Sequence, residues 1–321
     1  MMSPLRIGKN IAYRVYLYAR FCLPIWRYAL NRKTLAAWKQ VRTAIGPMES
    51  EIVSELQKNG IAVRNFDQLF SGLNFNDLKY FADSVSDTSK VKQEFMEHEK
   101  MIASRIAAGN ERTGKRKYLK DFVVEPWGST GNNLISDAAN PFIKASLYES
   151  VLLIAGLYMG ILPRFRAYHL RFNLLVPTGT PEYFSQRWHR DPEDRRMLKM
   201  FIYMTDVPDA AYGPFVYING SQPGGKYNKI FPQRPPASTY PEMGAVEKAI
   251  SAEDIKICLG KAGTVIFADT SGLHKGGYTI TAPRLMYTAT YFSDASLSKS
   301  YLKCDSLPQN FSFIQRFAVS R

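Results

Sequence analysis

Short apolar runs alternate with turns in the second half of the chain. After Pro163, the runs are rich in β-branched and aromatic residues, and glycine and proline recur between them. They cover residues 165–176, 198–205, 214–218, 264–269 and 285–292. Several short strands separated by turn residues predict an all-β sandwich or barrel.

The first half of the chain has helical periodicity instead. Residues 11–42 predict two short helices with a break near Pro24, and the Gly46-Pro47 pair ends this region. We therefore expect a protein that is mainly β with flanking helices. Its expected parts are a basic helical N-terminal segment, residues 1–46, and one domain, residues 47–321, with the β core at about 165–292.

Composition indicates a folded protein with an unusually basic N-terminus. Of the 321 residues, 45% are hydrophobic and only 22% are charged, which argues against disorder. The net charge is +14, and nine Lys and Arg residues precede the first acidic residue, Glu49. The total charge suggests an anionic partner, and most of the excess positive charge lies in this N-terminal segment.

Three interpretations of the basic segment remain open. Aromatic residues mixed with arginines are typical of a helix at a membrane surface, which would be a peripheral contact. Because Arg14, Arg20 and Arg27 do not share one helical face, a cap whose charges face water is favoured over the membrane contact, and nucleic-acid binding is the least favoured. These arginines also interrupt the apolar stretch at residues 11–30, so it does not predict a membrane span.

The cysteines indicate a reducing compartment. Cys22, Cys258 and Cys304 are few, odd in number and far apart, which matches neither a disulfide framework nor a metal-ligand spacing. A cytoplasmic location is expected.

A histidine and a carboxylate lie two residues apart in the sequence Trp188-His189-Arg190-Asp191. In an extended segment both point to the same side, so both can bind one ion, and His274 is the candidate third ligand. Asp194 is an alternative carboxylate, but its spacing of five residues from His189 places it on the opposite side. Two histidines and one carboxylate are typical of non-haem iron(II) oxygenases, although zinc hydrolases can use similar ligands.

Arg284 follows His274 by ten residues and begins an apolar, strand-like run. A guanidinium presents a fork of donors suited to a carboxylate, so Arg284 can bind the far carboxylate of a 2-oxoacid that chelates the metal. Period-two alternation places Met286 and Thr288 on the same face, which makes Thr288 a candidate second donor.

The strand before the metal motif has one polar face, formed by His169, Arg171 and Asn173. This face is either solvated or lines the cosubstrate pocket through Asn173 or Arg171. The remaining histidine, His98, lies in a polar helical run and is expected to be exposed.

These motifs together resemble the phytanoyl-CoA dioxygenase family over about residues 165–292. The motifs are His189-x-Asp191, residues 201–206 leading into Gly213-Pro214-Phe215, the Asn219-Gly220-Ser221 turn, and residues 263–267 followed by His274 and Arg284. Residues 59–63 give a weaker similarity. Gln222 departs from the family, which often has a histidine there, and this difference is interpreted as related to substrate.

The resemblance implies a double-stranded β-helix, a relative of the jelly roll and the cupin barrel. It also implies that His189, Asp191 and His274 bind Fe(II), that Arg284 binds 2-oxoglutarate, and that dioxygen is used to hydroxylate a small-molecule or lipid-like substrate. Succinate and CO2 would be the co-products. Two alternatives are a non-catalytic binding protein of the same fold, recruited to an anionic surface, and a zinc hydrolase, which would give Arg284 no role.

Overall fold

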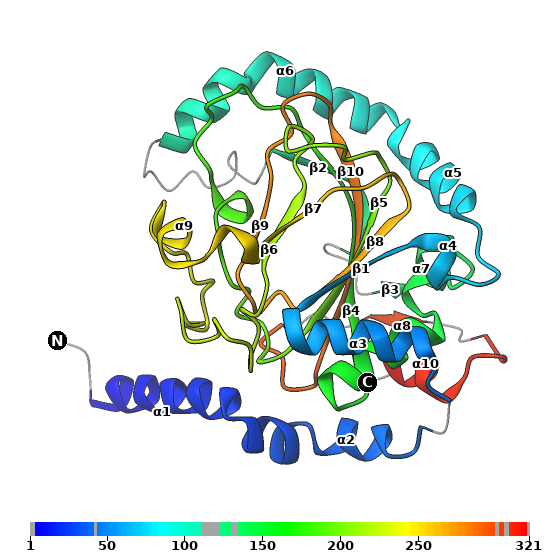
Figure 1. Ribbon diagram of the computed structural model, residues 1–321, viewed down its shortest axis with the longest axis vertical. Coiled ribbons are helices and arrows are strands. Elements are labelled where there is room, and N and C mark those ends of the chain that lie inside the picture. The colour runs from blue at the N-terminus through cyan, green and yellow to red at the C-terminus, as the bar shows by residue number, and fades with distance from the viewer. Residues whose placement is uncertain are drawn as a thin grey trace.

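Two antiparallel sheets form the centre of the protein (Figure 1). The computed structural model describes residues 4–41, 44–110, 122–129, 134–135, 137–298, 302–304 and 308–319. The major sheet has the strand order β1-β8-β5-β10-β4-β2, and the minor sheet has the order β7-β6-β9. A further pair, β11 and β3, is parallel.

The strands are β1 (Ile61–Asn65), β2 (Val123–Gly128), β3 (Leu134–Ile135), β4 (Arg164–Asn173), β5 (Leu198–Tyr203), β6 (Phe215–Ile218), β7 (Ile255–Cys258), β8 (Thr264–Ala268), β9 (His274–Gly276), β10 (Arg284–Phe292) and β11 (Lys303–Cys304). The α-helices are α1 (Pro4–Phe21), α2 (Arg32–Trp38), α3 (Pro47–Asn59), α4 (Phe66–Leu69), α5 (Phe75–Ser86), α6 (Ser89–Asn110), α7 (Pro141–Ser146), α8 (Glu149–Met159), α9 (Ala245–Ala249) and α10 (Phe313–Ala318).

The chain passes back and forth between the two sheets. From β5 in the major sheet it enters β6 and β7 in the minor sheet, returns to β8, crosses to β9 and returns again to β10. This winding is the double-stranded β-helix, a jelly-roll arrangement. The prediction of a double-stranded β-helix with flanking helices is therefore confirmed, although the helices hold more residues than the strands.

Strand β10 shows how the sequence separates core from cavity. Its odd-numbered side chains are buried in the main hydrophobic core beneath the helices, and its even-numbered ones face a cavity between the sheets. The side chains in the core are those of Leu285, Tyr287, Ala289 and Tyr291. The side chains that line the cavity are those of Arg284, Met286, Thr288, Thr290 and Phe292. Period-two alternation alone produces this division.

Helix α8 is the central helix of the core, packed against α3 and α10. The stretch Pro141–Met159, which includes α7 and α8, is long and apolar enough to cross a membrane by length and composition. However, 72% of it is buried inside the protein, as in the core helix of a globular domain. No other stretch among the described residues meets the same criteria.

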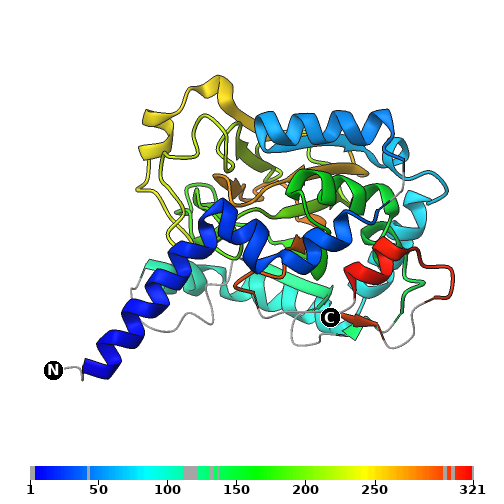
Figure 2. The same ribbon diagram turned by 90° about the horizontal axis from the view of Figure 1, so that it is seen from below.

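The N-terminal helices lie along one side of the protein, and α1 extends away from it (Figure 2). The predicted break near Pro24 is present, but the number of helices was wrong. A π-helix, η1 (Ile25–Leu30), separates α1 from α2. In η1, Trp26 is buried and its indole N–H donates to Asp194 at 2.7 Å. At the end of α1, the carbonyl oxygen of Phe21 accepts a hydrogen bond from Arg195 at 2.5 Å.

The division of the chain at residue 46 stays a prediction. Trp26, Leu35 and Ala37 precede it, yet they belong to the same hydrophobic cluster as Ile52 and Leu56 of α3. At least η1 and α2 therefore contribute side chains to the hydrophobic core of residues 47–321.

The prediction that His98 is exposed was wrong. His98 is only 3% exposed, and its Nε2 lies 2.8 Å from the carbonyl oxygen of Leu175. Its ring also contacts the Phe122 ring, with the centroids 5.9 Å apart. The polar neighbours of His98 on α6 face outward, and their composition conceals the fact that His98 lies on the inward face of the helix, with Val91 and Phe95.

Candidate metal centre

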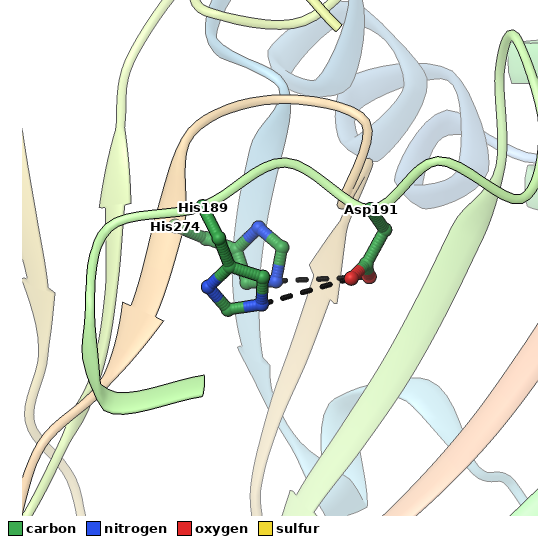
Figure 3. A group of neighbouring side chains, drawn as sticks. All are labelled: His189, Asp191 and His274. Carbon is green, nitrogen blue, oxygen red and sulfur yellow. Dashed lines mark ion pairs between the residues drawn. The ribbon is translucent and has the colours of Figure 1, made fainter. Parts of the chain in front are cut away.

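His189, Asp191 and His274 meet in the cavity between the sheets (Figure 3). His189 exchanges two backbone hydrogen bonds with His274, at 2.9 and 3.0 Å, which joins the segment before β5 to strand β9. Asp191 donates its backbone N–H to Thr270 at 2.9 Å, so the extended segment continues past the second ligand. The i, i+2 spacing therefore directs both side chains toward His274.

The three side chains present one donor atom each to a common point. His189 Nε2 lies 3.6 Å from Asp191 Oδ1, and His274 Nε2 lies 3.7 Å from Asp191 Oδ2. All candidate ligand atoms lie within 4.8 Å of one another, and all three residues are buried. This group can hold a metal ion. Its assignment as an iron site stays a prediction.

Backbone carbonyls fix the orientation of both imidazoles. His189 Nδ1 lies 2.8 Å from the carbonyl oxygen of Arg187, and His274 Nδ1 lies 3.0 Å from that of Gly272. A carbonyl can only accept, so each Nδ1 carries the proton and each Nε2 lone pair is left for a metal. Burial, and then the neighbouring His189, lower the pKa of His274 to about 3, which keeps this imidazole in its neutral, metal-binding form.

A lysine that the sequence interpretation missed lies against the carboxylate. Lys199 Nζ is 2.6 Å from Asp191 Oδ2. Burial by itself would raise the pKa of Asp191, but the charge of Lys199 and the two histidines bring it well below its usual range. Lys199 is the one charged residue of the otherwise apolar strand β5, and this exception was the available signal.

The cavity beside the three residues has a volume of about 350 Å³, and Arg284 lines it. Arg284 is only 2% exposed. Its guanidinium carbon lies 5.9 Å from the centroid of the Tyr203 ring, and among the described residues its Nε and Nη1 have no hydrogen-bond partner. A buried guanidinium with such donors can bind a carboxylate. The role of Arg284 in binding 2-oxoglutarate stays a prediction.

The other predicted binding residues line the same cavity. Asn173 lies opposite Arg284 in the β4–β10 register, and Thr288 lies opposite His169. The polar face of β4 is therefore turned toward the cavity, as the second interpretation of it expected. Contacts of Asn173 and Thr288 with 2-oxoglutarate stay predictions.

Arg171 and His169 share a carboxylate near this face. Glu125 Oε2 lies 2.7 Å from Arg171 Nε and 3.1 Å from His169 Nδ1. Unlike Arg284, Arg171 therefore has an anionic partner within the chain.

Two residues considered from the sequence lie outside the centre. Asp194 turns away, as its spacing predicted, and accepts hydrogen bonds from Trp26 at 2.7 Å and from the backbone N–H of Ser293 at 2.8 Å. Gln222 was interpreted as related to substrate, but its amide nitrogen donates to the carbonyl oxygens of Gln57 and Lys58. It connects the turn after β6 to the end of α3 and does not line the cavity.

No protein-family model matches this sequence, and no curated protein does. Solved structures similar to it include the non-haem α-ketoglutarate-dependent epimerase SnoN from nogalamycin biosynthesis, at 13% identity over 77% of this chain and 83% of that one, with a TM-score of 0.45. Another is EctD from S. alaskensis with 2-oxoglutarate and 5-hydroxyectoine, at 16% identity over 79% and 78%, with a TM-score of 0.47. EctD with bound Fe is 14% identical over 84% of both chains, with a TM-score of 0.44.

Proposed function

We propose that this protein is an iron(II)- and 2-oxoglutarate-dependent dioxygenase of the phytanoyl-CoA dioxygenase type, which hydroxylates a small-molecule or lipid-like substrate. The observation that carries the proposal is that the buried Arg284, whose Nε and Nη1 have no hydrogen-bond partner among the described residues, lines the same cavity as the two histidines and Asp191. A zinc hydrolase would leave these buried donors without a partner, at a cost of about 1–3 kcal/mol or more. The metal-binding group and the buried guanidinium together therefore favour a metal with a bound 2-oxoacid over a metal alone.

The metal would be held by His189 Nε2, His274 Nε2 and a carboxylate oxygen of Asp191, all three turned into the cavity. Iron(II) with 2-oxoglutarate would supply the oxidising chemistry, in which dioxygen is consumed, 2-oxoglutarate is converted to succinate and CO2, and a C–H bond becomes C–OH. Two histidines and one carboxylate leave open positions for the cosubstrate and dioxygen.

The remaining cavity residues orient the cosubstrate and exclude water. Arg284 would bind the far carboxylate through its two free donors, and Thr288 would offer a hydroxyl beside it. Phe201, Phe215 and Met286 belong to the apolar part of the lining. Apolar walls strengthen the charge pair at Arg284 because they keep the local dielectric constant low.

The test is turnover of 2-oxoglutarate. Anaerobically purified protein is loaded with Fe(II) and 2-oxoglutarate, oxygen is admitted, and succinate is measured with and without metabolite pools. Succinate above the level of an Arg284→Gln variant supports the proposal. Metal binding with no turnover in any pool would instead favour the non-catalytic binding protein of the same fold.

We also propose that the N-terminal helices bind an anionic membrane surface peripherally. Val15, Tyr18 and Cys22 follow one another at helical spacings of three and four, and all are exposed, Val15 at 62% and Tyr18 at 74%. The other side of α1 holds the buried residues Leu17 and Arg20. An apolar face on a projecting helix, within a segment that has nine basic residues and no acidic one before Glu49, suits an interface with anionic lipid.

Vesicle co-sedimentation tests the membrane proposal on the full chain. The wild type is expected to bind phosphatidylserine vesicles at low salt and to be released at high salt, since each basic residue near the surface contributes about 1 kcal/mol. Val15→Glu/Tyr18→Glu should stay in the supernatant. Tyr80→Glu, which changes an 80% exposed tyrosine on α5, is the matched control and should bind like the wild type.

A further inference from the structure

Lys199 projects from β5 toward the metal ligands, and its ammonium group lies 2.6 Å from Asp191 Oδ2. The side chain is only 22% exposed, whereas Phe201 and Tyr203 on the same face of the strand are apolar and buried. A lysine in this position costs desolvation free energy, and it also places a positive charge next to a cation site. We therefore expect Lys199 to have a function that compensates for its desolvation cost and for its repulsion of a metal cation.

The role follows from the two oxygens of Asp191. Oδ1 lies 3.6 Å from His189 Nε2, and Oδ2 lies 3.7 Å from His274 Nε2, so both oxygens are at a similar distance from the ligand nitrogens. Only Oδ2 bonds to Lys199. Among the described residues, no other hydrogen bond to the Asp191 carboxylate distinguishes one oxygen from the other.

We propose that Lys199 is a positioning residue that occupies Oδ2 of Asp191 and so keeps this carboxylate monodentate toward the metal. The inference rests on the proposed function, because it assumes that the three residues hold a metal. In an octahedral site, three protein atoms leave three positions, enough for a bidentate 2-oxoacid and dioxygen. A chelating Asp191 would leave only two, and the cosubstrate would then fill the site.

Water-proton relaxation of the Mn(II)-loaded protein measures the number of exchangeable waters on the metal, independently of turnover. In the Lys199→Met variant we expect the relaxivity to fall by about one third, as one of three open positions is lost to the second carboxylate oxygen. Mn(II) should bind at least as tightly as in the wild type, because a competing cation has been removed. Lys199→Arg retains a charged donor for Oδ2 and should restore the wild-type relaxivity.

Lys275→Gln provides a matched control. Lys275 is similarly buried, at 19% exposure, and also pairs with a carboxylate at 2.6 Å, but its partner is Glu182, which is outside the metal group. This variant should keep both the wild-type relaxivity and the wild-type Mn(II) affinity.

The outcomes separate this inference from the proposed function. Unchanged relaxivity in Lys199→Met overturns the inference alone, and so does weaker Mn(II) binding in that variant, which would mean that Lys199 only supports the local structure. If the wild-type protein binds neither Mn(II) nor Fe(II), the proposed function fails, and the inference fails with it.

Discussion

Each of the candidate metal ligands is fixed by a different neighbour. The imidazoles of His189 and His274 are held by backbone carbonyls, and the carboxylate of Asp191 is held by Lys199. Outer contacts of this kind restrict rotation of the side chains before a metal arrives. The orientation of the ligand group is therefore set in part by contacts with the surrounding chain.

Removal of one ligand should abolish metal binding and leave the fold intact. We expect Asp191→Ala and His274→Ala to bind Fe(II) more than about 100-fold more weakly, beyond the loss that is typical for residues outside the ligand shell. Anaerobic titration measures the affinity, and circular dichroism checks the fold. His169→Ala, which changes a cavity histidine outside the ligand group, should bind Fe(II) like the wild type. Wild-type affinity in Asp191→Ala would remove this residue from the ligands.

Replacement of Arg284 should affect the cosubstrate and spare the metal. Arg284→Gln removes a charge-assisted pair from a buried site, so 2-oxoglutarate should bind about 30-fold to nearly a thousandfold more weakly, equivalent to roughly 2–4 kcal/mol. Equilibrium titration of the Mn(II)-loaded protein provides the measurement.

Arg171→Gln is the matched control for this change. Arg171 lines the same cavity, but its Nε already donates to Glu125 at 2.7 Å. A loss of 2-oxoglutarate affinity in Arg171→Gln equal to that in Arg284→Gln would show that general positive charge, and not Arg284 specifically, attracts the cosubstrate.

The sequence was sufficient to select Asp191 over Asp194, because period-two geometry depends only on local backbone. It was also sufficient to place Met286 and Thr288 on the same face of β10 as Arg284. The bond between Lys199 and Asp191 was not predictable, since it joins β5 to a loop whose approach is set by the two sheets. The prediction that His98 is exposed failed for a related reason. The burial of His98 depends on where α6 packs, which local composition does not encode.

At the scale of elements, the apolar runs predicted strands more reliably than the helical pattern predicted helices. All five strand-like runs contain observed strands, namely β4, β5, β6, β8 and β10. The predicted pair of N-terminal helices instead forms α1, η1 and α2. Each hydrogen bond of a π-helix spans one residue more than that of an α-helix. Here Trp26 contacts Asp194 from the π-helix, so a tertiary contact accompanies the irregularity.

The contact between η1 and Asp194 should be a measurable part of stability. Trp26→Phe removes the only indole donor to a fully buried carboxylate, so we expect the free energy of unfolding to fall by at least about 1–3 kcal/mol. Chemical denaturation measures this difference. Tyr28→Phe, in the same helix but 62% exposed, should unfold like the wild type. Equal stability of the two variants would mean that the Asp194 contact contributes little.

At the scale of the whole molecule, the winding of the chain between two sheets brings together residues that are far apart in the sequence. His189 and His274 are adjacent only because β9 pairs with the segment before β5. Spacing and residue type predicted that they would share a site, whereas the size and lining of the cavity required the register of β4, β5 and β10.

Deletion of residues 1–46 should destabilise the whole protein. The deletion removes Trp26, Leu35 and Ala37 from the main core, and loss of a buried tryptophan alone costs about 3–5 kcal/mol. The midpoint of thermal unfolding should therefore fall. Val15→Glu/Tyr18→Glu alters only exposed side chains of the same segment and serves as the control. An unchanged midpoint after deletion would show that the segment is a separate unit.

The two hydrogen bonds that join the N-terminal helices to Asp194 and Arg195 have a consequence for regulation. They connect the helix proposed to bind lipid to the segment that carries Asp191, three residues before Asp194. If binding to a bilayer shifts that segment, the affinity for the metal changes by some factor. Thermodynamic linkage then requires that metal loading change the affinity for vesicles by the same factor. The apo and metal-loaded proteins would partition differently between solution and membrane.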